Sequence, residues 1–320
     1  MTLRPAIVGG APSDASQDAV VFLFHYDAAA DRATPCTGTL VAPRLVLTAR
    51  HCVSAGGGGA IACTSDGTQL GGGAIGADFA APDIHVYAGR ERPPFTRQAP
   101  RDIDPARWTP AARGAALFHD GARTLCDHDL ALVLLDAPIA DVPLAPLRLD
   151  RDARAGELVV AIGYGKASAE YEPARQERRD VPVKKVGPDD AHPVLGRSEL
   201  AFPESICEGD SGGPLLAQDS GAIVGIVSRG VTGDPVPDRP GDHCLDVDNI
   251  ATKLPPFRGV IDRAFQAAGA TPLEEPEPPG GCFECAAARG HAAPDLALVL
   301  ATVIVLYVVT ARSSRSGTAR

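Results

Sequence analysis

The octapeptide at residues 207–214, CEGDSGGP, constrains this chain more than any other stretch. It places Ser211 among glycines, and Gly209 has no side chain to shield its own backbone NH. The NH groups of Gly209 and Ser211 can therefore converge on a carbonyl oxygen that gains negative charge. This pattern predicts a serine nucleophile beside an oxyanion hole, although a glycine-rich turn between two strands uses the same residue types.

Three further motifs accompany the octapeptide. Residues 7–10 read IVGG, residues 48–52 read TARHC and contain His51, and residues 129–132 read DLAL and begin with Asp129. The candidate groups therefore follow the order His, Asp, Ser along the chain. On these four motifs together, the chain resembles the trypsin-like serine endopeptidases of the chymotrypsin fold.

The resemblance runs from Ile7 to about Gly269 and implies an all-β fold of two six-stranded antiparallel β-barrels followed by a C-terminal helix. Composition independently favours short strands joined by turns, because the chain has 34 Gly, 29 Pro and few helical runs. We expect residues 1–6 to be a short propeptide remnant and residues 7–269 to form the protease domain. The expected strands are residues 20–24, 158–165, 181–186, 214–217 and 222–228, and the expected helix spans residues 257–268, with Gly269 as its stop.

The resemblance implies proteolysis by side chains alone, with protein or peptide substrates and without a cofactor or metal. His51 would act as general base and then general acid, Asp129 would orient it and stabilise its imidazolium, and Ser211 would attack the scissile carbonyl to give an acyl-enzyme. Asp127 and His128, which precede Asp129, are expected to be exposed loop residues. The main alternative is a protein of the same fold that binds without turnover, or a zymogen that is never activated.

The resemblance also implies activation by cleavage before Ile7. The freed amino group would pair inside the protein with Asp210, since a buried ammonium and carboxylate are tolerable only as a pair. Residues 4–6, RPA, place no basic residue at the cut. We therefore expect a separate activating protease rather than self-activation by a trypsin-like activity.

Eight cysteines indicate an oxidising compartment, because cytosolic thiols mostly stay reduced. The expected disulfides are Cys36–Cys52 and Cys207–Cys244 from the resemblance, and Cys63–Cys126 by elimination. Export is therefore expected, yet residues 1–6 contain no apolar segment of a signal peptide. An upstream leader beyond this sequence is the favoured explanation, and another export route is the alternative.

The resemblance places five residues in the primary substrate pocket. Ser205 stands where the family has the pocket floor, and it supplies no carboxylate for an incoming lysine or arginine. Gly230 would leave one wall open, and the backbone groups of Ser228 and Gly230 would pair with the substrate strand. Arg229 occupies a position where the family often has tryptophan.

Asn249 is the fifth pocket residue and would project into the pocket and shorten it. We therefore expect cleavage after uncharged small or medium side chains such as alanine, valine or leucine. The register near Asp246 and Asp248 leaves an alternative open, because either carboxylate inside the pocket would restore cleavage after basic residues.

The composition changes beyond the expected domain. Residues 270–281 are rich in Pro and Glu and predict a polar linker. Residues 282–320 combine cysteines, an apolar helix at about residues 294–311 and a basic end, which predicts membrane anchoring with the basic end in the cytoplasm; a buried globular helix is the alternative. This layout resembles bacterial C-terminal sorting tails. We therefore expect the protein at a bacterial cell surface or outer envelope, anchored by the tail or released after processing.

Charge and length constrain the remaining functions. The formal net charge of -10 argues against nucleic acid as a partner, because a polyanion would be repelled. With 320 residues and 45% hydrophobic content, the chain can bury a substantial core. We therefore expect a globular domain.

Overall fold

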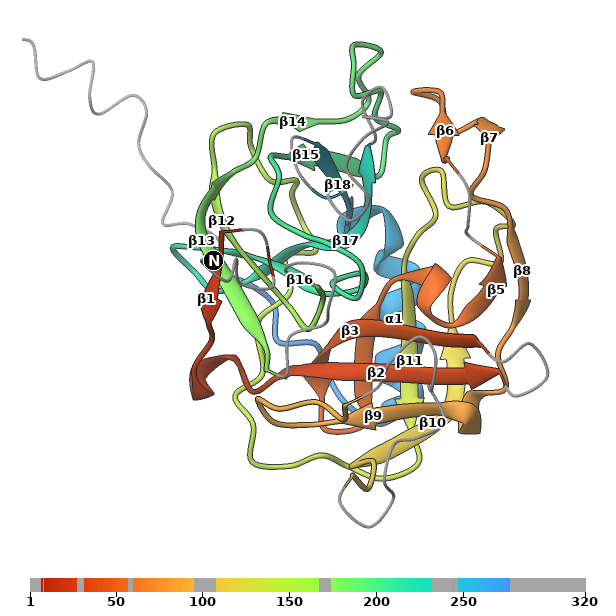
Figure 1. Ribbon diagram of the computed structural model, residues 1–320, viewed down its shortest axis with the longest axis vertical. Coiled ribbons are helices and arrows are strands. Elements are labelled where there is room, and N and C mark those ends of the chain that lie inside the picture. The colour runs from red at the N-terminus through yellow and green to blue at the C-terminus, as the bar shows by residue number, and fades with distance from the viewer. Residues whose placement is uncertain are drawn as a thin grey trace, which may run out of the picture. The chain divides into compact units, whose positions relative to one another are not determined.

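The computed structural model describes residues 7, 9–27, 32–56, 60–94, 108–166, 174–231, 244 and 247–276. Up to Glu275 these residues belong to one compact unit. Two large antiparallel sheets dominate this unit, one from each half of the chain (Figure 1).

Six strands of the N-terminal half close into a barrel in the order β10-β11-β4-β3-β2-β9. They are β2 (Val20–Asp27), β3 (Arg32–Ala42), β4 (Leu45–Thr48), β9 (Ile84–Tyr87), β10 (Ala112–Phe118) and β11 (Ala131–Leu135), drawn in red to yellow in Figure 1. Aliphatic and aromatic side chains from these strands are buried together, as the interior of a small barrel requires. The first expected barrel is confirmed.

The C-terminal half, joined by the two-residue strand β1 from the N-terminal end, forms an eight-stranded sheet in the order β1-β13-β12-β16-β17-β18-β15-β14. Its strands are β1 (Ala11–Pro12), β12 (Leu158–Gly163), β13 (Gln176–Pro182), β14 (Lys185–Val186), β15 (Glu199–Phe202), β16 (Pro214–Ala217), β17 (Ile223–Val231) and β18 (Asp248–Lys253). The edge strands β1 and β14 have two residues each, and in the described part of the chain they do not pair with each other. Edge strands of two residues can form few hydrogen bonds with each other. The structure therefore shows an open eight-stranded sheet, and the second closed six-stranded barrel that we expected is not shown.

The remaining elements are short. They are the hairpin strands β5 (Ser54–Gly56) with β8 (Ile75–Asp78) and β6 (Ala62–Cys63) with β7 (Gln69–Gly71), and the 3-10 turns η1 (Ala15–Gln17), η2 (Arg50–Cys52), η3 (Ala81–Asp83) and η4 (Pro255–Phe257). The helix α1 (Arg258–Ala268) buries one apolar face and ends at Gly269, whose left-handed φ of 65° suits a residue without a side chain. The expected C-terminal helix and its stop are thus confirmed.

The segment after α1 packs on the domain instead of leaving it. The Leu147 NH donates to the Leu273 carbonyl oxygen at 2.7 Å, and the buried Arg148 guanidinium donates to Glu275 Oε1 at 2.9 Å. Because Glu275 neutralises a buried cation, the folded unit ends at this residue rather than at Gly269. The rest of the expected linker and the whole tail lie outside the described residues.

No helix among the described residues is both long and apolar enough to cross a membrane. The apolar helix expected at about residues 294–311 lies outside this part of the chain. Its anchoring role therefore stays a prediction.

Candidate active site

The register of the barrel brings His51 next to Asp129. Thr48 on β4 pairs with Ala131 on β11, His51 lies in the 3-10 turn that follows β4, and Asp129 directly precedes β11. Asp129 Oδ1 accepts a hydrogen bond from the His51 backbone NH at 3.0 Å, and Asp129 Oδ2 lies 2.9 Å from His51 Nδ1. Two contacts to one carboxylate thus set both the backbone and the ring of the histidine.

The surroundings of this pair shift the pKa values of both Asp129 and His51. Asp129 is fully buried, which opposes its ionisation, but His51 and the Ser228 hydroxyl, which donates to Oδ2 at 2.6 Å, lower the pKa of its carboxyl below the ordinary value. Burial likewise opposes protonation of His51, yet the charge and hydrogen bond of Asp129 outweigh it and raise the pKa of the imidazole. The pair is therefore suited to hold a proton that arrives at His51.

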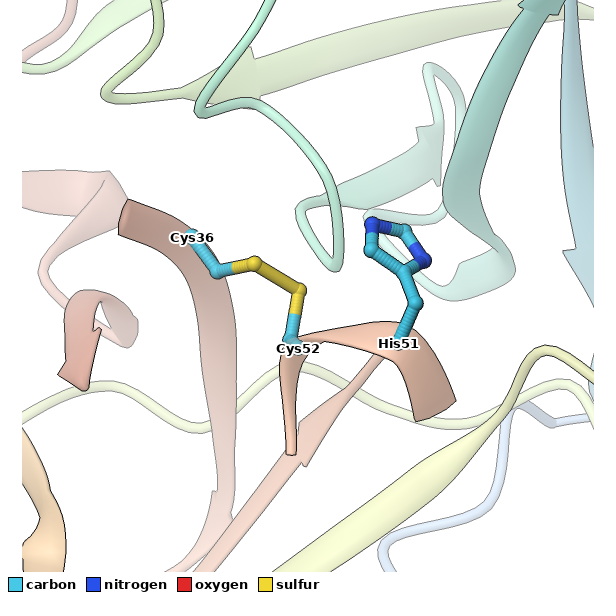
Figure 2. Close-up of side chains that lie close together, drawn as sticks. All are labelled: Cys36, His51 and Cys52. Carbon is cyan, nitrogen blue, oxygen red and sulfur yellow. A yellow bond between two sulfur atoms is a disulfide. The ribbon is translucent and has the colours of Figure 1, made fainter. Parts of the chain in front are cut away.

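A disulfide fastens the turn that carries His51. Figure 2 shows Cys36 on β3 bonded to Cys52, directly after the histidine. The three side chains lie close enough to resemble a metal site, but both sulfurs are in the disulfide and are not free thiolates. The cluster is a structural clamp. The other disulfides are Cys63–Cys126 and Cys207–Cys244, so all three expected pairings are present.

The loop that carries Ser211 is held by the N-terminal barrel. The Thr37 NH donates to the Ser211 carbonyl oxygen at 2.8 Å, and its hydroxyl donates to the Gly209 carbonyl oxygen at 2.8 Å. At Gly212, with φ of 80°, a Cβ would overlap the Thr48 hydroxyl and the Thr37 carbonyl. The roles of Thr37 and Thr48 could not be predicted from the sequence. Both residues meet the Ser211 loop only in the folded chain, and no local motif indicates a partner that distant in sequence.

The backbone of this loop leaves two donors available. Gly209 has φ of 97°, a conformation that favours glycine. Among the described residues, neither the Gly209 NH nor the Ser211 NH donates a hydrogen bond. Both are free to bind a carbonyl oxygen.

Ile7 and Asp210 are both fully buried in the uncut chain. Ile7 packs in the apolar core of the C-terminal half. Asp210 accepts hydrogen bonds from the Gly165 and Cys207 NH groups at 2.8 and 2.9 Å, but has no cationic partner among the described residues, and burial raises its pKa to about 7. The carboxyl is thus held in a site that disfavours its charge.

A cavity of about 370 Å³ connects the candidate groups. Its lining includes His51, Ser211, Ser228, Arg229, Gly230 and Asn249. Ser205 is not part of this lining among the described residues; it is fully buried and donates to the Pro203 carbonyl oxygen at 2.9 Å. The expected pocket floor therefore lies behind the surface that a substrate would meet.

Arg229 forms part of the cavity wall and is held by both halves of the molecule. Its guanidinium donates to Glu199 Oε1 at 2.7 Å and lies 3.6 Å from Cys63 Sγ. Glu199 is buried, so this ion pair satisfies a carboxylate that would otherwise be costly. Arg229 thus forms part of the cavity wall, and its positive charge is balanced by Glu199.

Asp127 is buried, contrary to the exposed loop position that we expected. Its carboxylate accepts hydrogen bonds from the backbone NH groups of Arg197 and Ser198 at 3.0 and 2.7 Å. The neighbouring His128 is 40% exposed and pairs with Asp120 at 2.6 Å. Asp127 therefore ties the Asp129 segment to the C-terminal half instead of facing solvent.

Comparisons with known proteins agree with this architecture. The sequence profile of the trypsin-like peptidase domain matches residues 36–226, which span His51, Asp129 and Ser211. The Cercarial protease of Schistosoma mansoni is 28% identical over 227 residues, covering 64% of this chain and 74% of that protein. Serine protease 7 of Drosophila melanogaster is 26% identical over 214 residues, covering 62% of this chain and 50% of that protein.

The protein is thus a serine-type endopeptidase, a hydrolase whose substrates are proteins. Since the profile covers more than half of the chain, the chain belongs to the trypsin-like peptidase domain family.

Proposed function

We propose that the protein cleaves peptide bonds through a His51–Asp129–Ser211 triad and an acyl-enzyme intermediate. The observation that carries this proposal is the doubly bonded Asp129–His51 pair, with Nδ1 at 2.9 Å from the carboxylate, in a cavity that Ser211 also lines. Because Nδ1 is engaged by Asp129, the remaining ring nitrogen, Nε2, is the one that can take a proton from a serine hydroxyl.

Each residue of the triad has one task. Ser211 Oγ attacks the scissile carbonyl while His51 Nε2 accepts its proton, and Asp129 stabilises the imidazolium. The free NH groups of Gly209 and Ser211 stabilise the oxyanion of the tetrahedral intermediate. His51 then protonates the departing amine, and water, activated by the same histidine, hydrolyses the acyl-enzyme.

Activation follows from the state of Asp210. Cleavage before Ile7 would supply the cation that its buried carboxyl lacks among the described residues. The new ammonium would then pair with Asp210 and order the Gly209–Ser211 loop. A separate protease makes this cut, since Ala6 precedes the bond.

Labelling by an active-site serine phosphonate tests the proposal. The full chain is treated before and after deliberate cleavage between Ala6 and Ile7, and the modified residue is identified by mass spectrometry. We expect Ser211 to be labelled much faster after the cut. Absence of labelling in both states would instead support the alternative, a silent binding protein of this fold or a permanent zymogen.

We propose cleavage after uncharged small or medium side chains, such as alanine, valine or leucine. Ser205 offers no carboxylate, and Asp248 Oδ1 is 2.6 Å from Lys184 Nζ rather than in the cavity lining. Asp246 lies outside the described residues. A peptide library cut mainly after lysine or arginine would contradict this specificity.

We also propose that residues 282–320 anchor the exported protein at a bacterial surface, as their apolar run and basic end indicate. The full chain should partition into membranes, whereas a chain ending at Pro276 should stay in the aqueous phase. Equal partitioning of both chains would remove the anchor. This test is independent of proteolysis.

A further inference from the structure

The orientation of the Asn249 side chain follows from its neighbours. Asn249 on β18 lies opposite Gly230 on β17, is fully buried and lines the cavity. Its Nδ2 donates to the Pro203 carbonyl oxygen at 3.0 Å, and the Ser205 hydroxyl donates to the same oxygen. Because a carbonyl oxygen only accepts, the amide nitrogen must face Pro203. The amide oxygen is thereby fixed on the other side.

Asn249 Oδ1 is a buried acceptor that has no hydrogen-bond partner among the described residues. A Cβ built on Gly230 would lie 3.6 Å from this oxygen, so a side chain at position 230 would be in van der Waals contact with it. Unsatisfied buried acceptors are rare and costly in native structures. Asn249 lines the cavity that Ser211 also lines, so a substrate donor that enters the cavity beside Gly230 can satisfy this acceptor.

The charges around the cavity favour a neutral donor over a cation. Glu208 supplies the one carboxylate among the described residues that line the cavity. This carboxylate is already paired, because Lys166 Nζ lies 2.5 Å from its Oε2. Arg229 on the same wall is paired with the buried Glu199, so that carboxylate is matched as well. A lysine or arginine side chain would therefore lose its hydration without meeting an unmatched carboxylate.

We propose that Asn249 Oδ1 reads the substrate side chain before the scissile bond by accepting a hydrogen bond from it. Within the uncharged small or medium side chains already proposed, the pocket then prefers one with a hydroxyl or carboxamide donor over an aliphatic one of equal size: threonine over valine, and asparagine over leucine. This inference rests on the proposed function, since it requires a substrate positioned for attack by Ser211.

Matched peptides test the inference on the full chain activated by cleavage before Ile7. Four peptides differ only before the scissile bond, with valine, threonine, leucine or asparagine there. We expect kcat/KM to be about tenfold higher for each donor-bearing residue than for its isostere, because the aliphatic residue leaves Oδ1 unpaired. Equal or reversed ratios, or preferential cleavage after lysine, would overturn the inference.

Two variants locate the effect. Asn249→Leu removes the acceptor and should abolish or reverse both preferences. Asp248→Asn is the matched control on the same strand, where successive side chains point to opposite faces; Asp248 pairs with Lys184, and both ratios should be retained. Unchanged ratios in Asn249→Leu would refute the role of Oδ1, and if this variant does not fold, the ratios of the wild-type enzyme decide.

Phosphonate labelling separates the two possible failures. A cut chain whose Ser211 is not labelled refutes the proposed function itself. A labelled chain that shows no preference for threonine over valine refutes only the reading by Asn249.

Discussion

The two halves of the molecule hold their functional groups by different means. In the N-terminal half, a closed barrel pairs β4 with β11, and this register brings His51 next to Asp129. In the C-terminal half, an open sheet carries the loop with Ser211 and the buried Asp210, which has no cationic partner among the described residues. The His51–Asp129 pair is in place in the uncut chain, whereas burial disfavours the charge of Asp210.

Under the proposed activation, regulation would act on the C-terminal half. A closed barrel leaves no strand edge to rearrange, so the acid–base pair is preorganised. In the proposed mechanism, the loop of Ser211 depends on a buried carboxyl whose charge would become favourable when a cation arrives. Cleavage before Ile7 would therefore change the C-terminal half and leave the His51–Asp129 geometry as it is.

The largest expected effect lies in the C-terminal half. Ser211→Ala removes the nucleophile and should lower kcat on the order of a millionfold in the cut protein, as in a comparable triad. Thermal unfolding should be nearly unchanged, since Ser211 is held through its backbone by Thr37. Peptide hydrolysis by the purified variant measures this, and activity above about a hundredth of wild type would exclude Ser211 as nucleophile.

The next effect belongs to the barrel. Asp129→Asn keeps the shape of the side chain but places an amide against His51 and favours the wrong tautomer, so kcat should fall by about ten-thousandfold. Asp120→Asn, which alters the partner of His128 on the preceding loop, is the control and should retain activity. A small loss in Asp129→Asn would break the view that the barrel register sets the acid–base pair.

The parts predictable from sequence are those set by local pattern. The apolar run at residues 20–24 became β2, and helical spacing with Gly269 as the stop gave α1. His51, Asp129 and Ser211 each lie within a few residues of a strand, so the short motifs around them were enough to place them next to those strands. The open second sheet was not predictable, because strand closure depends on the pairing of edges far apart in the chain.

Residues with distant partners escaped prediction for the same reason. The sequence predicts an exposed position for Asp127, but its carboxylate is buried and accepts hydrogen bonds from the NH groups of Arg197 and Ser198. Glu275 looked like part of a polar linker, but Arg148 binds it inside the domain. In both cases the carboxylate is buried by a contact with a residue distant in sequence. Local composition cannot predict such a contact, because it forms only when the chain folds.

A third prediction tests whether the uncut C-terminal half carries an electrostatic penalty. Folded Asp210 keeps its proton up to about pH 7, whereas the ordinary value is 3.8. The folded state therefore binds more protons in this window, and its stability falls as pH rises from about 4 to 7, by about 4 kcal/mol at about 1.4 kcal/mol per pKa unit. In Asp210→Asn this part of the pH dependence should vanish.

Urea unfolding of the uncut chain at pH 4 and pH 8 provides the measurement. Asp219→Asn, at an exposed site, is the control and should keep the wild-type pH dependence. Cleavage before Ile7 should also remove the penalty in the wild-type protein, because the ammonium compensates Asp210. Identical pH dependence in the uncut wild type and Asp210→Asn would mean that the two halves do not differ in this way.

The smallest expected effect concerns one of the contacts between the halves. Ser228 on β17 donates to Asp129 Oδ2 at 2.6 Å, while His51 keeps its own two contacts with the carboxylate. Ser228→Ala should therefore leave the triad assembled and lower kcat by about tenfold, the value of one hydrogen bond to a charged group. Ser16→Ala, an exposed serine of η1, is the control.

The pH profile of Ser228→Ala distinguishes this electrostatic role from loose packing. The Ser228 hydrogen bond lowers the pKa of Asp129, so its loss makes the carboxylate more basic and stabilises the His51 imidazolium. Because His51 must be unprotonated to act as base, activity is lost as pH falls through its pKa, and a higher pKa moves this acid limb of kcat/KM to higher pH. A lower kcat with an unmoved acid limb would mean that Ser228 only fills space, and that the C-terminal half contributes nothing to the charge of the acid–base pair.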